Sequence, residues 1–171
     1  MGKTLIVIDV QNDYFPGGKF PLWNTEETLS RTVSAVQRAQ MQGVPVILVQ
    51  HVADSSRGLA PFFNAGTSGV ELHHALIQAA PEAPVVVKAF ADSFYQTALE
   101  ATLAGLGATE LLVCGMMTQN CVTHTAISKS AEKYGVSVLV DCCTTVSEIL
   151  HRIALHALST RVSLVSSTDA H

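Results

Sequence analysis

The sequence predicts a three-layer α/β/α fold, in which helices cover both faces of a six-stranded, mostly parallel sheet of Rossmann-like order 3-2-1-4-5-6. Six short apolar runs of strand type alternate with segments of helical period. The runs are apolar throughout, as expected for strands that are buried on both faces. Charged residues make up only 14% of the 171 residues and hydrophobic residues 48%, which fits a doubly covered sheet and an oligomer that hides further surface.

The first half of the chain predicts a strand, a helix and a second strand, followed by a long connection. A β-branched apolar run indicates the first strand at residues 4–9. Asn24 is the expected N-cap of a helix over residues 24–42, which has acidic residues in its first turn. Residues 45–50 form the second strand. The irregular residues 51–83 are interpreted as a pocket wall or a subunit contact.

The second half continues the alternation of apolar strands and helices. Its predicted elements are a strand at 84–88, a helix with Leu99, Leu103 and Leu106 on one face and its end at Gly107, a strand at 110–114, a helix from about Gln119 to Gly135, a strand at 136–140, a helix at 147–159 and a strand at 161–165. No glycine-rich dinucleotide motif follows the first strand and no P-loop is present, so we predict no cofactor.

Bulk composition limits the functional classes. The length is most simply explained by one domain over residues 1–171. A net charge of −4 without a lysine or arginine cluster argues against nucleic-acid and anionic-membrane partners. The sequence has no membrane-length apolar run, no signal-peptide pattern and no disulfide framework among its four cysteines. We therefore expect a reduced, cytoplasmic protein that forms a homo-oligomer, either a dimer or a tetramer.

Three reactive side chains follow separate predicted strands at the edge where open α/β sheets bind ligands: Asp9, Lys88 and Cys121. Cys121 begins a helix, where free amides and the helix dipole favour a thiolate. A buried carboxylate and a buried ammonium each need a partner, so Asp9 and Lys88 are expected to pair. Each residue alone also fits a structural role, but the three together favour catalysis. Cys142 and Cys143 have no base beside them and are interpreted as structural thiols.

The three residues suit acyl transfer through a thioester. We expect Lys88 and the helix start to lower the pKa of Cys121. Asp9 would take the thiol proton, pass it to the leaving group and then activate water. Backbone amides of the turn at 116–121 could form an oxyanion hole. The predicted reaction is hydrolysis of a small amide, imide or similar C–N bond.

Three segments carry a resemblance to a known family. They are Ile8-Asp9-Val10-Gln11-Asn12-Asp13, the strand that ends in Lys88, and Cys114-Gly115-Met116-Met117-Thr118-Gln119-Asn120-Cys121-Val122. In this order they closely resemble the isochorismatase-like cysteine hydrolase family, and the resemblance covers essentially the whole chain. It implies a parallel six-stranded α/β/α sheet, a triad of Asp9, Lys88 and Cys121, oxyanion-binding amides at Met117 and Cys121, and a cis peptide between Met116 and Met117.

Departures from the family pattern bear on the substrate. Nicotinamidases of the family bind a metal through Asp-x-His and a further histidine after the second strand. Here that strand continues Gln50-His51-Val52-Ala53-Asp54, so we expect neither nicotinamidase activity nor a metal. Isochorismatases that cleave a vinyl ether can lack the cysteine, and Cys121 argues against that activity.

The pocket and the remaining histidines are assigned by residue type and position. We expect an apolar substrate pocket with one polar reader, lined by Phe15, Trp23, Phe62, Phe90 and Gln119. His151 and His156 lie in the last helix and are expected on its solvent or subunit-contact faces. Vinyl-ether hydrolysis, and a non-catalytic thiol sensor or binding protein on the same fold, remain the alternative functions.

Overall fold

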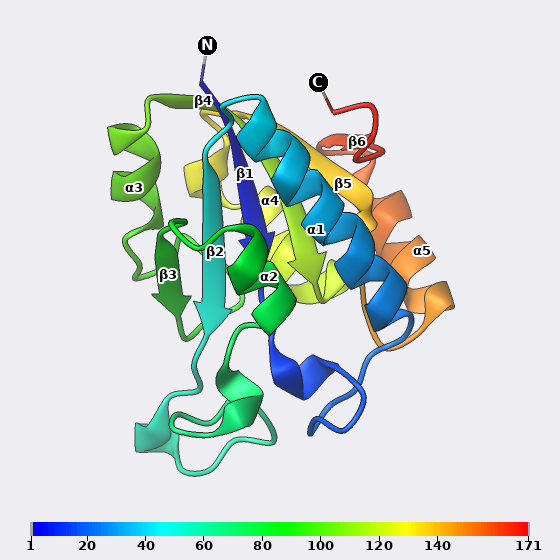
Figure 1. Cartoon of the computed structure of the whole chain (residues 1–171). Helices are drawn as coiled ribbons and strands as arrows, with labels where there is room; N and C mark the ends of the chain where they lie inside the picture. The colour runs from blue at the N-terminus through cyan, green and yellow to red at the C-terminus, as the bar shows by residue number, and fades with distance from the viewer. Residues whose placement is uncertain (1, 171) are drawn as a thin grey trace.

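The computed structural model describes residues 2–170 and contains a six-stranded sheet in the order β3-β2-β1-β4-β5-β6 (Figure 1). Every neighbouring pair of strands is parallel. The strands are β1 (Gly2–Ile8), β2 (Val46–His51), β3 (Val85–Lys88), β4 (Ala108–Met116), β5 (Gly135–Thr144) and β6 (Ser163–Val165). The predicted fold class and strand order are confirmed, whereas β4 and β5 extend several residues further than predicted.

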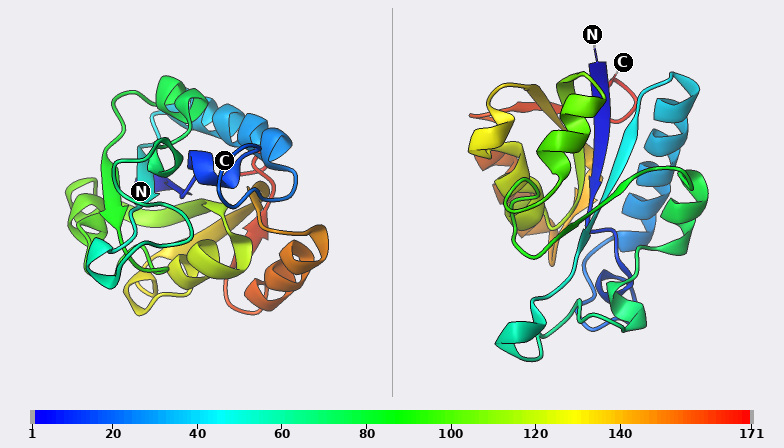
Figure 2. Two further views of the ribbon diagram at one scale, coloured as in Figure 1. Left: turned by 90° about the horizontal axis from the view of Figure 1, so that it is seen from below. Right: turned by 90° about the vertical axis from the view of Figure 1, so that its left-hand side faces the viewer.

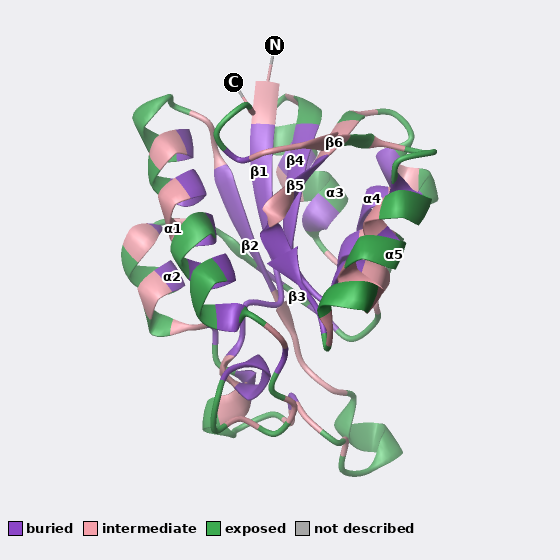
Figure 3. Cartoon of the chain, turned by 90° about the vertical axis from the view of Figure 1, so that its right-hand side faces the viewer, coloured by how far each residue is buried: buried purple, intermediate pink, exposed green. Residues whose placement is uncertain are grey.

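Helices cover both faces of the sheet, as the parallel connections require. Figure 3 shows α1 and α2 on one side of the strands and α3, α4 and α5 on the other. Their bounds are α1 (Thr25–Met41), α2 (His74–Ala79), α3 (Leu99–Gly105), α4 (Thr123–Ala126) and α5 (Glu148–Leu158). Short helical turns are η1 (Asn12–Tyr14), η2 (Ser55–Arg57), η3 (Ser68–Val70), η4 (Thr118–Val122) and η5 (Lys129–Ala131).

The two central strands form the middle of the core. The side chains from Leu5 to Ile8 in β1 are at most 1% exposed, and those from Leu111 to Met116 in β4 are also buried. The sheet can pack this closely because Gly115 adopts a φ of +127°, and a Cβ at that position would overlap the backbone of Ile8. The close approach brings the ends of β1 and β4 together.

The helix predicted between Gln119 and Gly135 is not continuous. It is replaced by the π-helical turn η4, the four-residue α4 and the 3-10 turn η5. Hydroxyl groups compete with the regular backbone pattern there: Thr123 Oγ1 donates to Thr118 O at 2.6 Å, and Ser128 Oγ accepts from Ser130 N. The predicted apolar face of α3 is also shorter, because Leu106 follows the helix and is 40% exposed.

The carboxyl ends of the strands meet two long loops. The loop after β1 and the loop after β2 lie below the arrowheads in Figure 1, and both cross the view from below in Figure 2. Gln11 of the first loop forms an isolated bridge with Leu72. The loops therefore cover the edge of the sheet at which the predicted catalytic residues lie.

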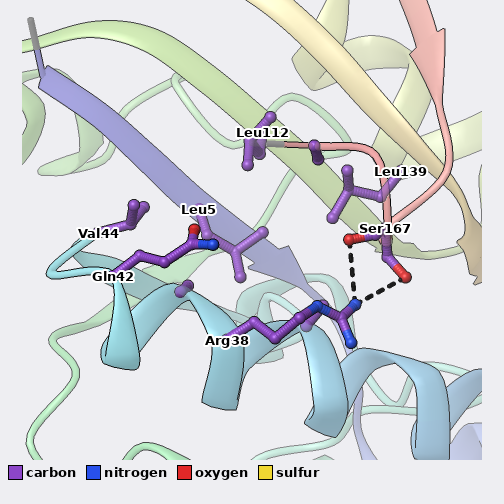
Figure 4. A pocket seen from close by; sticks show the side chains of 10 residues that line it. Leu5, Arg38, Gln42, Val44, Leu112, Leu139 and Ser167 are labelled. Atoms are coloured by element: carbon purple, nitrogen blue, oxygen red, sulfur yellow. Dashed lines mark hydrogen bonds between the residues drawn. The ribbon is translucent and has the colours of Figure 1, made fainter.

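A polar clamp holds the C-terminal segment against α1 (Figure 4). Arg38 Nη2 donates to the carbonyl and hydroxyl oxygens of Ser167, both at 3.0 Å. Ser167 in turn donates its amide and hydroxyl to the carboxylate of Asp141, both at 2.7 Å. The clamp fixes the chain after β6. Within residues 2–170, no helix combines the length and hydropathy needed to cross a membrane.

Candidate active site

The three predicted catalytic side chains meet at the carboxyl end of the sheet. Lys88 Nζ lies 2.9 Å from Asp9 Oδ2 and 3.3 Å from Cys121 Sγ. Asp9 follows β1, Lys88 ends β3, and Cys121 lies in η4 beyond β4. The side chains of Asp9 and Lys88 are fully buried, so each charge compensates the other in a site with little access to water. The expected pairing of Asp9 with Lys88 is therefore present.

Asp9 presents one of its two carboxylate oxygens without a partner. Its backbone has a φ of +53°, a strained conformation for a residue other than glycine. Oδ2 accepts from Lys88, whereas Oδ1 is buried and has no hydrogen-bond partner within residues 2–170. An acceptor atom of Asp9 and the sulfur of Cys121 lie within 4.8 Å of each other. The free oxygen can accept a proton from the thiol or from a water molecule.

The predicted lowering of the pKa of Cys121 is wrong. Burial and the neighbouring carboxylate of Asp9 raise the pKa of this thiol, and they outweigh Lys88, which lowers it. Cys121 is only 2% exposed and lies within η4 rather than in the first turn of a long helix. Desolvation, which the sequence pattern does not report, therefore dominates. The resting nucleophile is a thiol, and its activation requires a base.

The turn before Cys121 begins with a cis peptide bond between Met116 and Met117, at the position that the family resemblance implies. Met117 O accepts from Asn120 N at 3.0 Å and from Val122 N at 3.3 Å. These bonds close the chain into η4. The oxyanion-binding role of the Met117 and Cys121 amides stays a prediction.

Sequence reasoning missed the position of His51 in the site. His51 Nδ1 lies 2.8 Å from Lys88 Nζ, because β2 and β3 pair His51 directly with Lys88. The register of two adjacent strand ends is the signal that could have revealed it. Candidate ligand atoms of Asp9, His51 and Cys121 lie within 4.8 Å of one another. However, the ammonium of Lys88 contacts all three groups, so they do not fit a metal ion while Lys88 is in place.

Tyr14 and Phe15 lie in different surroundings, although they are adjacent in sequence. Phe15 packs on His73 at a ring distance of 4.5 Å and lines a groove of about 820 Å³ that contains no triad residue. Tyr14 is 1% exposed, and its pKa is raised by burial and by the neighbouring carboxylate of Asp9. Its ring packs against Phe63 at 4.6 Å. The pocket assignment of Phe15 stays a prediction.

The other predicted pocket residues surround the site at different distances. Phe90 O accepts from Lys88 Nζ at 3.0 Å, but the Phe90 ring is 40% exposed. Phe62 belongs to the aromatic cluster around Tyr14, at a ring distance of 5.5 Å. Gln119 Nε2 lies 3.8 Å from Met117 Sδ, and its Oε1 has no partner among the described residues. Substrate contacts by these residues stay predictions.

His151 contacts the nucleophile turn instead of facing solvent or a subunit, so its predicted placement is wrong. Its Nδ1 lies 2.8 Å from Thr118 Oγ1, and the half-buried ring packs near Trp23 at 6.1 Å. Thr118 is fully buried at the start of η4. Burial lowers the pKa of His151. His156 is exposed, in keeping with its predicted position.

A second polar network joins the loop after β3 to α4. Ser128 Oγ donates to Asp92 Oδ2 at 2.7 Å. Ser93 N donates to Thr125 Oγ1 at 3.0 Å, and that hydroxyl donates to Ser93 Oγ at 2.8 Å. The loop starts directly after Lys88, while α4 follows directly after the turn of Cys121. The network therefore ties the segment that follows Lys88 to the segment that follows Cys121.

Comparisons with known proteins agree with this geometry. Residues 3–170 match the family model described as "Isochorismatase domain". An uncharacterized isochorismatase family protein, YddQ of Bacillus subtilis, is 34% identical over 99% of this chain and 98% of its own. Ureidoacrylate amidohydrolase RutB of Methylobacterium radiotolerans is 30% identical over 97% of this chain and 76% of its own.

A solved structure shows the same architecture. The isochorismatase family protein from Desulfovibrio vulgaris superimposes with a TM-score of 0.87 at 25% identity, covering 97% of this chain and 94% of that one. Nicotinamidase from Bacillus subtilis has a TM-score of 0.86 at 23% identity, covering 97% of this chain and all of that one. The second likeness concerns the fold alone.

Proposed function

Because the chain belongs to the isochorismatase family, we propose that it is a cysteine hydrolase that cleaves a small amide- or imide-type C–N bond through a thioester. The observation that supports this most is the ammonium of Lys88, which contacts both the carboxylate of Asp9 and the sulfur of Cys121. A buried thiol needs a base to become a nucleophile. Asp9 lies close to the sulfur, and one of its oxygens has no partner among residues 2–170.

In the first half-reaction, Asp9 Oδ1 accepts the thiol proton while Cys121 Sγ attacks the substrate carbonyl carbon. The amides of Met117 and Cys121 would hold the oxyanion. Asp9 then gives its proton to the leaving nitrogen, the C–N bond breaks, and an acyl group remains on the sulfur. In the second half-reaction, Asp9 removes a proton from water, which attacks the thioester carbonyl. The acid leaves and the thiol reforms.

Lys88 supports both steps without reacting itself. Neighbouring acceptors raise its pKa despite its burial, so the ammonium stays charged and keeps Asp9 ionised before attack. Its hydrogen bond also holds the carboxylate so that Oδ1 is left for the proton. Amide-type chemistry is further supported by the amidohydrolase among the relatives.

The test is intact-protein mass spectrometry after rapid mixing with a panel of small amides, imides and ureides. A mass increase localised to Cys121 is expected with substrates that are turned over, and it should be absent in Cys121→Ala. Asp9→Asn should abolish turnover while Cys121 still reacts with iodoacetamide. Cys143→Ala is the matched control, since Cys143 is a buried thiol outside the site, and should keep turnover.

Two results would contradict the proposal. Full hydrolysis by Lys88→Ala or Asp9→Asn would show that the roles assigned to these two residues are wrong. Turnover that survives Cys121→Ala would favour vinyl-ether hydrolysis, which needs no thioester.

The remaining proposals concern the setting of this activity. We propose a cofactor-free enzyme of one domain that works in the cytoplasm on small molecules, without nucleic-acid or membrane partners. We also propose a homo-oligomer, which the exposed apolar side chains of Ile149 and Ile153 on α5 support. Light scattering during gel filtration measures the subunit number, and a monomer at micromolar concentration would contradict this last point.

A further inference from the structure

The backbone N–H and C=O groups of His51 both form hydrogen bonds with one buried side chain. His51 N donates to Gln11 Oε1, and Gln11 Nε2 donates to His51 O, each at 2.8 Å. Gln11 is fully buried and also donates to Val70 O at 2.7 Å. Two opposed bonds to one carboxamide fix both the position and the orientation of the end of β2. The imidazole therefore has a defined place beside Lys88.

The chemistry of the partners defines the tautomer of His51. A lysine ammonium has three donors and no acceptor. The contact of 2.8 Å between Lys88 Nζ and His51 Nδ1 is thus a bond that the lysine donates, and Nδ1 carries no proton. Burial and the charge of Lys88 lower the pKa of His51, in agreement with a neutral ring. The single ring proton lies on Nε2.

The ammonium meets more acceptors than it has protons. Among the described residues its partners are His51 Nδ1 at 2.8 Å, Asp9 Oδ2 at 2.9 Å, Phe90 O at 3.0 Å and Cys121 Sγ at 3.3 Å. Oxygen and nitrogen are stronger acceptors than a thiol sulfur. The three shorter contacts therefore compete with the sulfur for the three N–H groups and weaken the hydrogen bond of 3.3 Å from Lys88 to Cys121 Sγ.

We propose that His51 helps burial and Asp9 to keep Cys121 protonated at rest, by accepting an ammonium hydrogen that would otherwise point at the sulfur and stabilise its thiolate. The benefit of a protonated resting sulfur rests on the proposed function. A resting thiol keeps in the site the proton that Asp9 later transfers to the leaving nitrogen. A resting thiolate would have lost that proton to solvent and would also be open to oxidation. His51 acts through Lys88 and is a positioning residue.

The test compares two variants of nearly equal shape, His51→Leu and His51→Asn. Asparagine can place an oxygen near the position of Nδ1, whereas leucine offers no acceptor. The readout is the pH dependence of alkylation of Cys121 by iodoacetamide, followed by peptide mass spectrometry. Other charges that face the sulfur, those of Asp9 and Lys88, and the buried Tyr14 hydroxyl are the same in both variants.

In His51→Leu we expect the midpoint of the alkylation profile to fall by about one pH unit, so that Cys121 reacts about tenfold faster at a fixed pH below it. His51→Asn should keep the wild-type midpoint. Equal midpoints in the two variants, or a higher midpoint in His51→Leu, would overturn the inference. Cys121→Ser measures the background from the other three cysteines.

A second measurement needs no variant and covers the case in which His51→Leu does not fold. Nitrogen-15 NMR of the wild-type histidines should show His51 near neutral pH with a proton on Nε2 and a bare Nδ1. A proton on Nδ1 would overturn the inference, because Lys88 could not then donate to that atom. Neither assay depends on turnover. A failed alkylation or NMR result would therefore leave the proposed hydrolase intact, while an inactive enzyme with the expected profile would leave His51's role intact.

Discussion

Replacing Lys88 by methionine measures how much the cation of the buried ion pair contributes to the free energy of unfolding. Methionine keeps the apolar length of the side chain but removes the charge that faces Asp9 at 2.9 Å. Both side chains are fully buried, and Asp9 Oδ1 already lacks a partner among residues 2–170. Breaking a buried pair in this way costs about 3–5 kcal/mol, so we expect a loss of this size in the free energy of unfolding at about pH 8.

The loss should depend on pH with a definite sign. In Lys88→Met the carboxyl of Asp9 is buried without a cation, so burial favours its neutral form in the folded state. A group with a raised acidic pKa binds its proton more tightly in the folded state, and its penalty is relieved as the pH falls through that pKa. The variant should therefore be more stable at about pH 5 than at about pH 8.

Urea unfolding followed by the fluorescence of Trp23, the sole tryptophan, measures these free energies. Asp9→Asn combined with Lys88→Met removes both charges and should be more stable than Lys88→Met alone. Lys133→Met removes an exposed partner of Glu100 and should leave the midpoint nearly unchanged. A loss below about 1 kcal/mol in Lys88→Met, or stability that rises with pH, would refute the reasoning.

Two further predictions concern the polar contacts around the triad. His151→Phe keeps a ring beside the nucleophile turn but removes the bond to Thr118 Oγ1, so kcat should fall about 10- to 100-fold through misplacement of the turn. The alkylation midpoint of Cys121 should stay unchanged, and an unaltered kcat would contradict this positioning role. Ser128→Ala leaves Asp92 Oδ2 without its hydroxyl donor and should cost about 1–3 kcal/mol in urea unfolding, whereas an unchanged free energy would show that water replaces the hydroxyl.

Sequence periodicity was sufficient to predict the sheet. A strand that is apolar throughout must be covered by helices on both faces of its sheet. The carboxyl ends of such parallel strands bring residues that are distant in sequence together. Asp9, Lys88 and Cys121 were therefore found from their positions alone. Their contacts in the structure agree with that reasoning, although their catalytic roles stay predictions.

The sequence-based predictions fail where tertiary contacts override a local sequence pattern. The period after Gln119 resembles that of a helix, but serine and threonine hydroxyls divide it into η4, α4 and η5. The lowered pKa expected for Cys121 followed from nearby positive charge and neglected burial. Tyr14 was missed because only the fold of the turn η1 brings its buried ring near Asp9.

His51 and His151 could not be placed from the sequence for a related reason. Each touches the site through a partner on another element, Lys88 on β3 and Thr118 on η4. Such contacts depend on strand register and on the rotation of α5 about its axis. Neither quantity leaves a short-range signal in the sequence.

Lys88, which supplies the ammonium of the site, lies on an edge strand of the sheet. β3 has only four residues and pairs with β2 alone, yet Lys88 must reach across β2 to Asp9 after β1, a lateral distance of about 10 Å at the usual strand spacing. Edge strands separate from their sheet at a lower cost in free energy than central strands do. Warming should therefore detach the cation while the remaining strands stay paired, so that activity fades reversibly at temperatures below the melting transition.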